Sequence, residues 1–278
     1  MPPHRRQMTM TRPPFRRCLP FALAVAVLLL SACASKEPTA PAREPEPPPP
    51  VKQQEVSPQR RAELHTDLAA GYYERGQMDV ALNELNEAVK LEPNNAKAYN
   101  IYGLVYTVLG ENAKAEQNFR RALTLAPQDS ETRQNWGWYL CTHERVKESI
   151  PEFEQAVSNP LYKTPEIPLI NGGRCSMMIG DAKAAEGFFQ RALAVAPGNE
   201  PAAYGLALLA FRAGRYDDAR RWMKAIRQTN LPPEALYLGM CVERKLGDRQ
   251  AETSYTAQLR NRYPDSAEAK ALAQGACE

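Results

Sequence analysis

Cysteine and histidine are the side chains here most able to do chemistry, and their spacing limits that chemistry. The sequence has six cysteines and three histidines. Cys141 and His143 could be a thiol nucleophile with its base, but residues two apart on a helix point to different sides. His65 and His143 are too few and too far apart in sequence for a metal site. The sequence also has no Gly-x-Ser-x-Gly, no His-Glu-x-x-His and no phosphate-binding glycine loop. We therefore expect no enzyme, metal site, cofactor or small-molecule substrate.

The first 32 residues have the pattern of an export signal. A cationic stretch ends at Arg16 and Arg17, an apolar run of 12 residues extends from Leu19 to Leu30, and small residues follow. The run is too short for a membrane-spanning helix, which needs about 20 residues. Removing residues 1–32 takes away five arginines and no acidic residue, so the formal charge changes from +3 to −2, with 30 basic and 32 acidic residues left. Such a chain has no basic footprint for nucleic acid.

The end of the apolar run, Leu30-Ser31-Ala32-Cys33, resembles the lipobox of bacterial lipoproteins. The resemblance implies that Cys33 is lipidated and becomes the first residue of the mature protein, and several acyl chains give stable membrane attachment. The residue after Cys33 is Ala34 and not aspartate, which in such lipoproteins implies transfer to the outer membrane. We expect a lipid-anchored protein facing the periplasm; the alternative is an ordinary signal peptide whose cleavage site happens to precede a cysteine.

Residues 33–57 begin with this cysteine and continue as a polar, proline-rich stretch with four consecutive prolines at Pro47–Pro50. A stretch without an apolar period cannot bury enough surface to fold. We expect a disordered tether that tends toward extended polyproline II, with a reach of up to about 70 Å.

Residues 58–278 show an internal repeat with a period of 34 residues, the period of tetratricopeptide (TPR) helical hairpins. The residues that recur are Tyr72 and Tyr106, Ala81 and Ala115, Ala88 and Ala122, and Pro93 and Pro127. We predict an all-α superhelical solenoid of about six repeats, each with a helix A, a turn and a helix B, followed by a capping helix near 265–275. The expected blocks are 62–95, 96–129, 130–163, 166–199, 200–233 and about 234–266.

Small residues and glycines mark how each block is built. A small residue such as Ala69 or Gly103 lets helix A approach helix B closely, and a glycine between the helices permits a left-handed turn. The expected turn glycines are Gly76, Gly110, Gly180, Gly214 and Gly247. Glu144 takes this place in the third block. In the sixth block we expect Glu252 and Thr256 at positions that are apolar elsewhere, as befits a solenoid end that faces water.

Four cysteines remain if Cys18 leaves with the signal and Cys33 carries lipid, and an even number suits disulfides in an oxidising compartment. Cys141 and Cys175 fall in the A helices of neighbouring blocks, which lie side by side, so they could form a bridge. The alternative is two buried free thiols. A second bridge, Cys241–Cys277, would clamp the chain's tail on the last block.

Several large apolar residues fall on the side of helix A that does not face helix B, the concave side of such a solenoid. They are Tyr73, Leu104, Val108, Trp138, Tyr204, Leu208 and Phe211. Exposed apolar patches mark partner sites, and aromatic side chains dominate their energetics. We expect a groove for a peptide segment, although any one of these residues could instead pack between repeats.

The whole arrangement resembles the type IV pilus biogenesis and stability lipoproteins, the PilW/PilF pilotin family. The segments Asn135–Cys141 and Asn171–Cys175 look like that family's Asn-x-Gly…Cys helix A sequences. The resemblance implies a scaffold that binds the secretin of the pilus and promotes its outer-membrane localisation and assembly into a ring. The alternative is a TPR lipoprotein adaptor for cell-wall synthases or for the outer-membrane barrel-assembly machinery.

Overall fold

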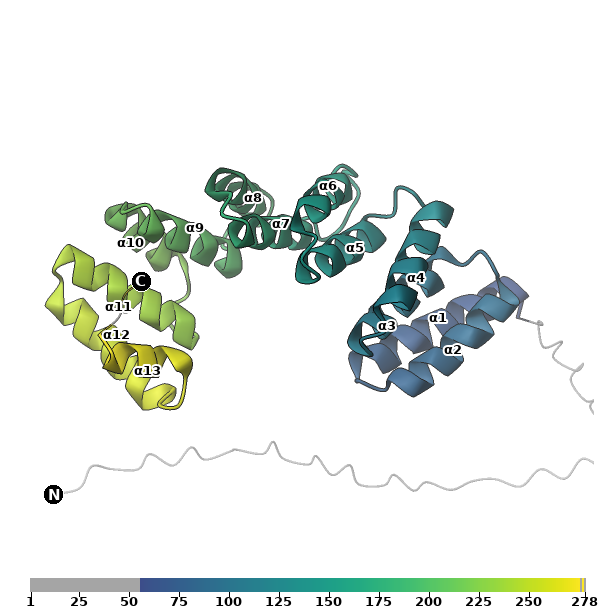
Figure 1. Ribbon diagram of the computed structural model, residues 1–278, viewed down its shortest axis with the longest axis horizontal. Helices are drawn as coiled ribbons and strands as arrows, with labels where there is room; N and C mark the ends of the chain where they lie inside the picture. Colours follow the sequence, from purple (N-terminus) through teal and green to yellow (C-terminus); the bar gives the residue numbers. More distant parts are fainter. Residues whose placement is uncertain (1–55, 276, 278) are drawn as a thin grey trace, which may run out of the picture. The chain divides into compact units, whose positions relative to one another are not determined.

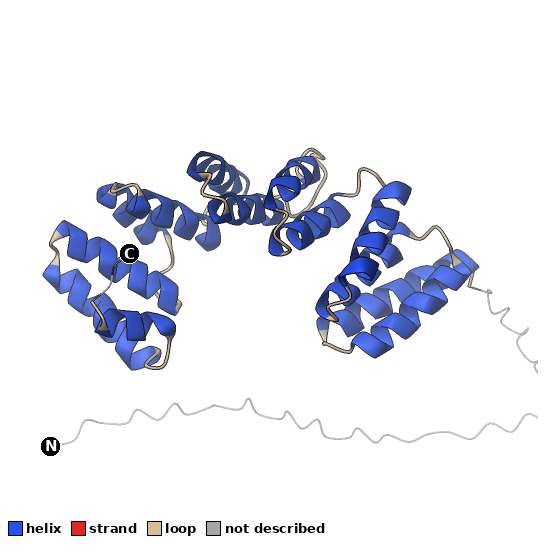
Figure 2. Ribbon diagram, viewed as in Figure 1, coloured by secondary structure: helices blue, strands red, loops and turns tan. Residues whose placement is uncertain are grey.

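The computed structural model describes residues 56–275 and residue 277. This part of the chain contains thirteen helices and no strand (Figure 2). Residues 1–55, which include Cys33 and almost all of the expected tether, lie outside this description. The helices are α1 (Pro58–Glu74), α2 (Met78–Leu91), α3 (Ala96–Val108), α4 (Asn112–Leu125), α5 (Ser130–Thr142), α6 (Val146–Ala156), α7 (Glu166–Met178), α8 (Ala182–Val195), α9 (Glu200–Arg212), α10 (Tyr216–Ala225), α11 (Pro233–Leu246), α12 (Arg249–Arg262) and α13 (Ala267–Ala273).

Consecutive helices pair into six antiparallel hairpins, and α13 follows the last of them (Figure 1). The odd-numbered helices α1 to α11 are the A helices, and the even-numbered helices α2 to α12 are the B helices. Each A helix also contacts the A helix of the next hairpin, and α11 contacts α13. The prediction of an all-α solenoid of six TPR-type repeats with a final capping helix is therefore confirmed.

Local signals set the ends of the helices. The side chains of Asn95, Asp129 and Asn199 accept hydrogen bonds from the backbone amides three residues later, which caps α3, α5 and α9. The five expected turn glycines all have positive φ, from 73° to 77°. Glu144 adopts the same left-handed conformation, with φ 64°, so the third hairpin keeps the turn without its glycine.

One contact recurs inside the hairpins, between a small residue of helix A and a large side chain of helix B 16 residues later. A Cβ added to Gly103 would lie 2.6 Å from the Phe119 ring, and one added to Gly173 would lie 2.6 Å from the Phe189 ring. Gly137 and Phe153 form the same pair in the third hairpin. In the first and fifth hairpins, buried Ala69 with Leu85 and buried Ala207 with Met223 hold the equivalent places.

The sixth hairpin has this contact too, and the sequence prediction placed it wrongly. Gly239 packs against Tyr255, whose ring lies 2.8 Å from where a Cβ on Gly239 would be. The predicted alignment of the sixth repeat put Glu252 and Thr256 at the apolar positions of helix B. In the structure Tyr255, one residue before Thr256, makes the contact. A one-residue offset turns a helix by about 100°, so it changes which side chains face the partner helix. The last repeat is therefore packed internally, although α12 buries only Leu259 fully.

Two disulfides are present in the described residues, and each involves at least one A helix. Cys141 of α5 pairs with Cys175 of α7, with their Cα atoms 6.0 Å apart, and Cys241 of α11 pairs with Cys277, at a Cα separation of 5.5 Å. The first bridge joins the third and fourth hairpins, and the second holds the end of the chain on the sixth. Both predicted pairings are present in the structure.

Replacing Gly173 by alanine is expected to lower the free energy of unfolding by about 2 kcal/mol, because the new methyl group must displace the buried Phe189 ring. Gly187 of α8 is the matched control, since a Cβ there meets no atom within 4 Å. Gly187→Ala should stabilise the protein by up to about 1 kcal/mol. Urea unfolding followed by circular dichroism measures both, and equal effects of the two substitutions would contradict this packing.

Replacing both Cys141 and Cys175 by alanine is expected to lower the free energy of unfolding by about 3 kcal/mol, since the bridge closes a loop with a sequence separation of 34 residues. Replacing both avoids a lone reactive thiol. Helix content should stay unchanged while the urea midpoint falls. An unchanged midpoint would mean that the bridge does not restrict the unfolded chain.

Candidate functional site

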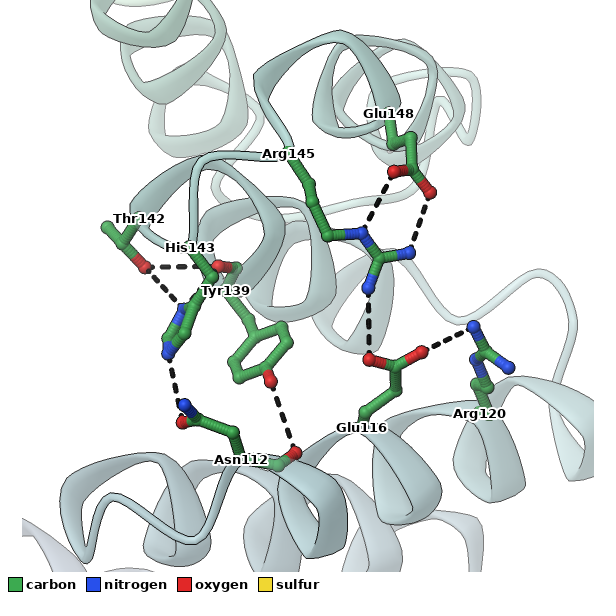
Figure 3. A network of polar contacts seen from close by, with 8 residues as sticks. All are labelled: Asn112, Glu116, Arg120, Tyr139, Thr142, His143, Arg145 and Glu148. Carbon is green, nitrogen blue, oxygen red and sulfur yellow. Dashed lines mark hydrogen bonds and ion pairs between the residues drawn. The ribbon is translucent and has the colours of Figure 1, made fainter.

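Cys141 and His143 do not form a nucleophile with its base. The Cys141 sulfur is in a disulfide. His143 Nδ1 lies 2.8 Å from the Tyr139 carbonyl oxygen and Nε2 lies 3.1 Å from Asn112 Oδ1 (Figure 3). The imidazole also stacks on the Tyr139 ring, with centroids 4.1 Å apart. His143 is thus a structural link from the end of α5 to α4.

An arginine beside it ties the second hairpin to the third. Arg145 Nη1 donates to Glu116 of α4 at 2.9 Å, while Nε and Nη2 donate to the two carboxylate oxygens of Glu148 at 2.9 and 2.7 Å (Figure 3). Glu116 also pairs with Arg120. The hydrogen bonds from Arg145 lower the pKa of Glu148 below its usual value. This network follows the turn at Glu144 and joins α4 to α6, so we interpret it as structural.

The binding site that the geometry supports best lies on the A-helix face, which we define as the surface of the A helices that faces away from the B helices. Tyr204, Leu208 and Phe211 of α9 line a cavity of about 330 Å³ there, together with residues of α11 and α13. Tyr204 and Leu208 are half-buried and Phe211 is buried. We call this space the terminal cavity.

The walls of the terminal cavity are mainly apolar. Leu238 and Cys241 of α11 contribute to one wall, and Ala267 and Ala271 of α13 contribute to another. The disulfide from Cys241 to Cys277 fixes the chain just beyond α13 against α11. The capping helix is therefore a wall of a cavity as well as an end to the solenoid.

A second cavity of about 180 Å³ adjoins the first. Tyr204 and Glu234 line both spaces, so these two side chains separate them. Ile226, Pro232 and Ala235 supply apolar surface in the smaller cavity. Two neighbouring apolar spaces of this size can each accept a side chain of a bound segment.

Charged groups surround the Tyr204 hydroxyl. Burial, followed by the negative charges of Glu234 and Glu268, raises the pKa of Tyr204 to about 12, although Arg212 opposes the shift. The phenol is thus protonated at neutral pH and can donate a hydrogen bond, but the hydroxyl bonds to no other described residue. Arg212, Glu234 and Glu268 likewise form no ion pair with a described residue. The cavity therefore offers charged groups that no other described residue neutralises.

The other four residues that the sequence indicated do not gather at this cavity. Tyr73 is half-buried against the core of the first two hairpins, and Leu104 packs in the core of the second and third. Val108 of α3 is 57% exposed and Trp138 of α5 is 39% exposed. These two exposed apolar side chains lie on neighbouring A helices.

Sequence reasoning missed the contributions of α11 and α13 to the site. It did not predict that Tyr237 and Leu238 line the site, and it considered the alanines of α13 only as parts of a capping helix. The spacing of Ala267 and Ala271, four residues apart, could have indicated that α13 presents a small apolar face, but this spacing does not tell which part of the fold the face meets.

The described residues contain no group of three or more His, Cys, Asp or Glu side chains that could hold a metal ion. None of the described helices is long and apolar enough to cross a membrane.

Comparisons with known proteins agree with this architecture. Tetratricopeptide repeat models match residues 66–130 and 178–238. The crystal structure of PilW, a widely conserved type IV pilus biogenesis factor, is 33% identical, with a TM-score of 0.69, and the match covers 76% of this chain and 98% of PilW. The chain belongs to the PilW/PilF family of type IV pilus biogenesis proteins.

Two further matches extend this family relationship. The type IV pilus assembly protein PilF of Pseudomonas aeruginosa is 25% identical over 207 residues, which are 74% of this chain and 82% of PilF. A solved structure of Pseudomonas aeruginosa PilF covers 79% of this chain and 99% of its own, with 23% identity and a TM-score of 0.73, and establishes the shared fold. As a PilW/PilF-family TPR protein, the chain has an architecture typical of protein-binding scaffolds.

Replacing Arg145 by glutamine in this PilW/PilF-family protein is expected to raise the pKa of Glu148 toward its ordinary value, since the charged donor is lost. A carboxyl whose pKa is lowered in the folded state stabilises the fold above its unfolded pKa, and that stabilisation is lost as pH falls through the folded pKa. The variant should therefore lose stability less steeply on acidification. Carbon-detected NMR titration of Glu148 measures the shift, and an identical titration curve in both proteins would contradict the pairing.

Proposed function

We propose that this protein is an outer-membrane lipoprotein that binds the type IV pilus secretin through its A-helix face and promotes the secretin's localisation and assembly into a ring. The observation that carries this proposal is the terminal cavity, with its apolar walls and with charged groups that pair with no described residue, on a chain of the PilW/PilF family. The relatives are pilus biogenesis proteins, and the secretin is the partner that the family resemblance implies.

The character of the surface favours a protein segment over a small metabolite. The cavities are open spaces between helices, and charged side chains such as Arg212 and Glu234 lie beside apolar ones. A protein partner can fill such spaces with anchor side chains and contact the remainder of the surface with its backbone and neighbouring residues. The exposed Val108 and Trp138 extend the apolar surface available along the A helices.

The expected lipid anchor supplies the second half of the proposed function. Lipidation at Cys33 would hold the solenoid at the outer membrane, and the proline-rich stretch would allow it to reach a client some distance from the bilayer. A secretin subunit bound to the A-helix face would then be carried to the membrane by its partner's acyl chains. This arrangement separates the task of binding from the task of membrane attachment.

Replacing Cys33 by alanine is expected to leave folding intact and to move both this protein and the secretin ring away from the outer membrane. The matched control is Cys18→Ala, which changes a cysteine within the expected signal and should leave both distributions unchanged. Membrane fractionation with immunoblotting of both proteins measures the outcome. Secretin that stays in the outer membrane when the lipoprotein leaves it would contradict the proposal.

A further inference from the structure

The two adjoining cavities on the A-helix face are arranged to accept two neighbouring side chains of one segment. Tyr204 and Glu234 belong to the walls of both, so the two spaces are direct neighbours. In an extended chain, residues i and i+2 point to the same side and are separated by about 6.6 Å. An extended segment can therefore place one apolar side chain in each cavity.

The charges around Tyr204 favour a cation next to those apolar side chains. Glu234 on α11 and Glu268 on α13 both line the terminal cavity, and the negative charge of each raises the pKa of Tyr204. Neither forms an ion pair with a described residue. Arg212 of the terminal cavity and Arg174 of the adjoining cavity are positive, and Glu200 also lines the adjoining cavity, so the charged side chains that line the two cavities sum to one net negative charge. A lysine or arginine of a partner would be attracted to this rim.

The wall formed by α13 is held in place at two points. Glu268, Ala267 and Ala271 line the cavity from this seven-residue helix. Buried Leu272 anchors the helix in the core of the last two hairpins, and Cys277 fixes the chain after it to α11. A wall held at two points changes little on binding, so less affinity is lost to ordering it.

We propose that the paired cavities recognise an extended segment of a partner protein that carries two bulky apolar side chains at positions i and i+2, followed by a basic side chain. The apolar pair occupies the two spaces on either side of Tyr204, and the basic group contacts Glu234 and Glu268. This inference rests on the proposed function, since it assigns the recognised chemistry at the same A-helix face.

Binding of designed peptides to the mature full-length lipoprotein tests the proposal. The probe is a fluorescein-labelled ten-residue Gly-Ser peptide with Phe and Leu at i and i+2 and two lysines after them. One comparison peptide has glutamates in place of the lysines, and another has serines in place of Phe and Leu. Fluorescence anisotropy in detergent, with protein-free micelles as the blank, should show the lysine peptide binding about tenfold more tightly than either comparison peptide.

Variants locate the binding on the cavities. The double substitution Glu234→Lys and Glu268→Lys should weaken binding of the lysine peptide about tenfold and strengthen binding of the glutamate peptide. Ala267→Trp should weaken binding of the lysine peptide about tenfold, because Ala267 is exposed at the cavity and a large side chain there fills it. Glu74→Lys is the matched control: Glu74 is an exposed carboxylate at the end of α1 without an ion pair to a described residue, and its reversal should change nothing.

Equal binding of the three peptides, or binding that the double substitution and Ala267→Trp leave unchanged, overturns the inference. Circular dichroism checks that each variant retains its helix content. If Ala267→Trp unfolds α13, the double substitution still tests the inference, because it adds no bulk and Glu234 is exposed. Failure of this inference is distinguishable from failure of the proposed function. If peptide discrimination is lost while Cys33→Ala still displaces the secretin, only the assigned recognition chemistry is wrong.

Discussion

The close contact between a small residue of helix A and a large side chain of helix B is the constraint on which the solenoid depends. Gly103, Gly137, Gly173 and Gly239 each leave too little space for a Cβ beside an aromatic ring. Interiors packed to this density transmit any added volume to the backbone. The contact therefore fixes how near the two helices of a hairpin lie. Because it occurs at the same place in successive repeats, it also fixes which side of every A helix remains available to other molecules.

The binding surface follows from that regularity. Once the B helices occupy one side of the A helices, equivalent positions of neighbouring A helices come together on the other side. Residues far apart in the chain, such as Tyr204 and Glu268, then act on one site. Where the repeat departs from its pattern, specific interactions replace it: Glu144 adopts a left-handed turn, and Arg145 joins two hairpins through carboxylates.

Periodicity was enough to predict the helical hairpins, the turn glycines and the proximity of Cys141 to Cys175, because each depends on local spacing repeated along the chain. It failed at Glu252 and Thr256, since an offset of one residue in the last repeat leaves the period almost unchanged but places Tyr255 against Gly239. It also indicated Tyr204, Leu208 and Phe211 without the cavity that unites them. That cavity depends on where α13 folds back, and a short helix outside the repeat carries no periodic signal for its position.

The dependence of the terminal cavity on α13 connects the site to the redox conditions under which the protein folds. A seven-residue helix is too short to be stable alone in water, so its position must come from tertiary contacts. Leu272 provides an apolar contact, and the Cys241–Cys277 bridge provides a covalent one. Disulfides persist in oxidising compartments such as the bacterial periplasm. The export signal expected in residues 1–32 would deliver the chain to a compartment of this kind, where the bridge can hold α13 as a wall of the cavity.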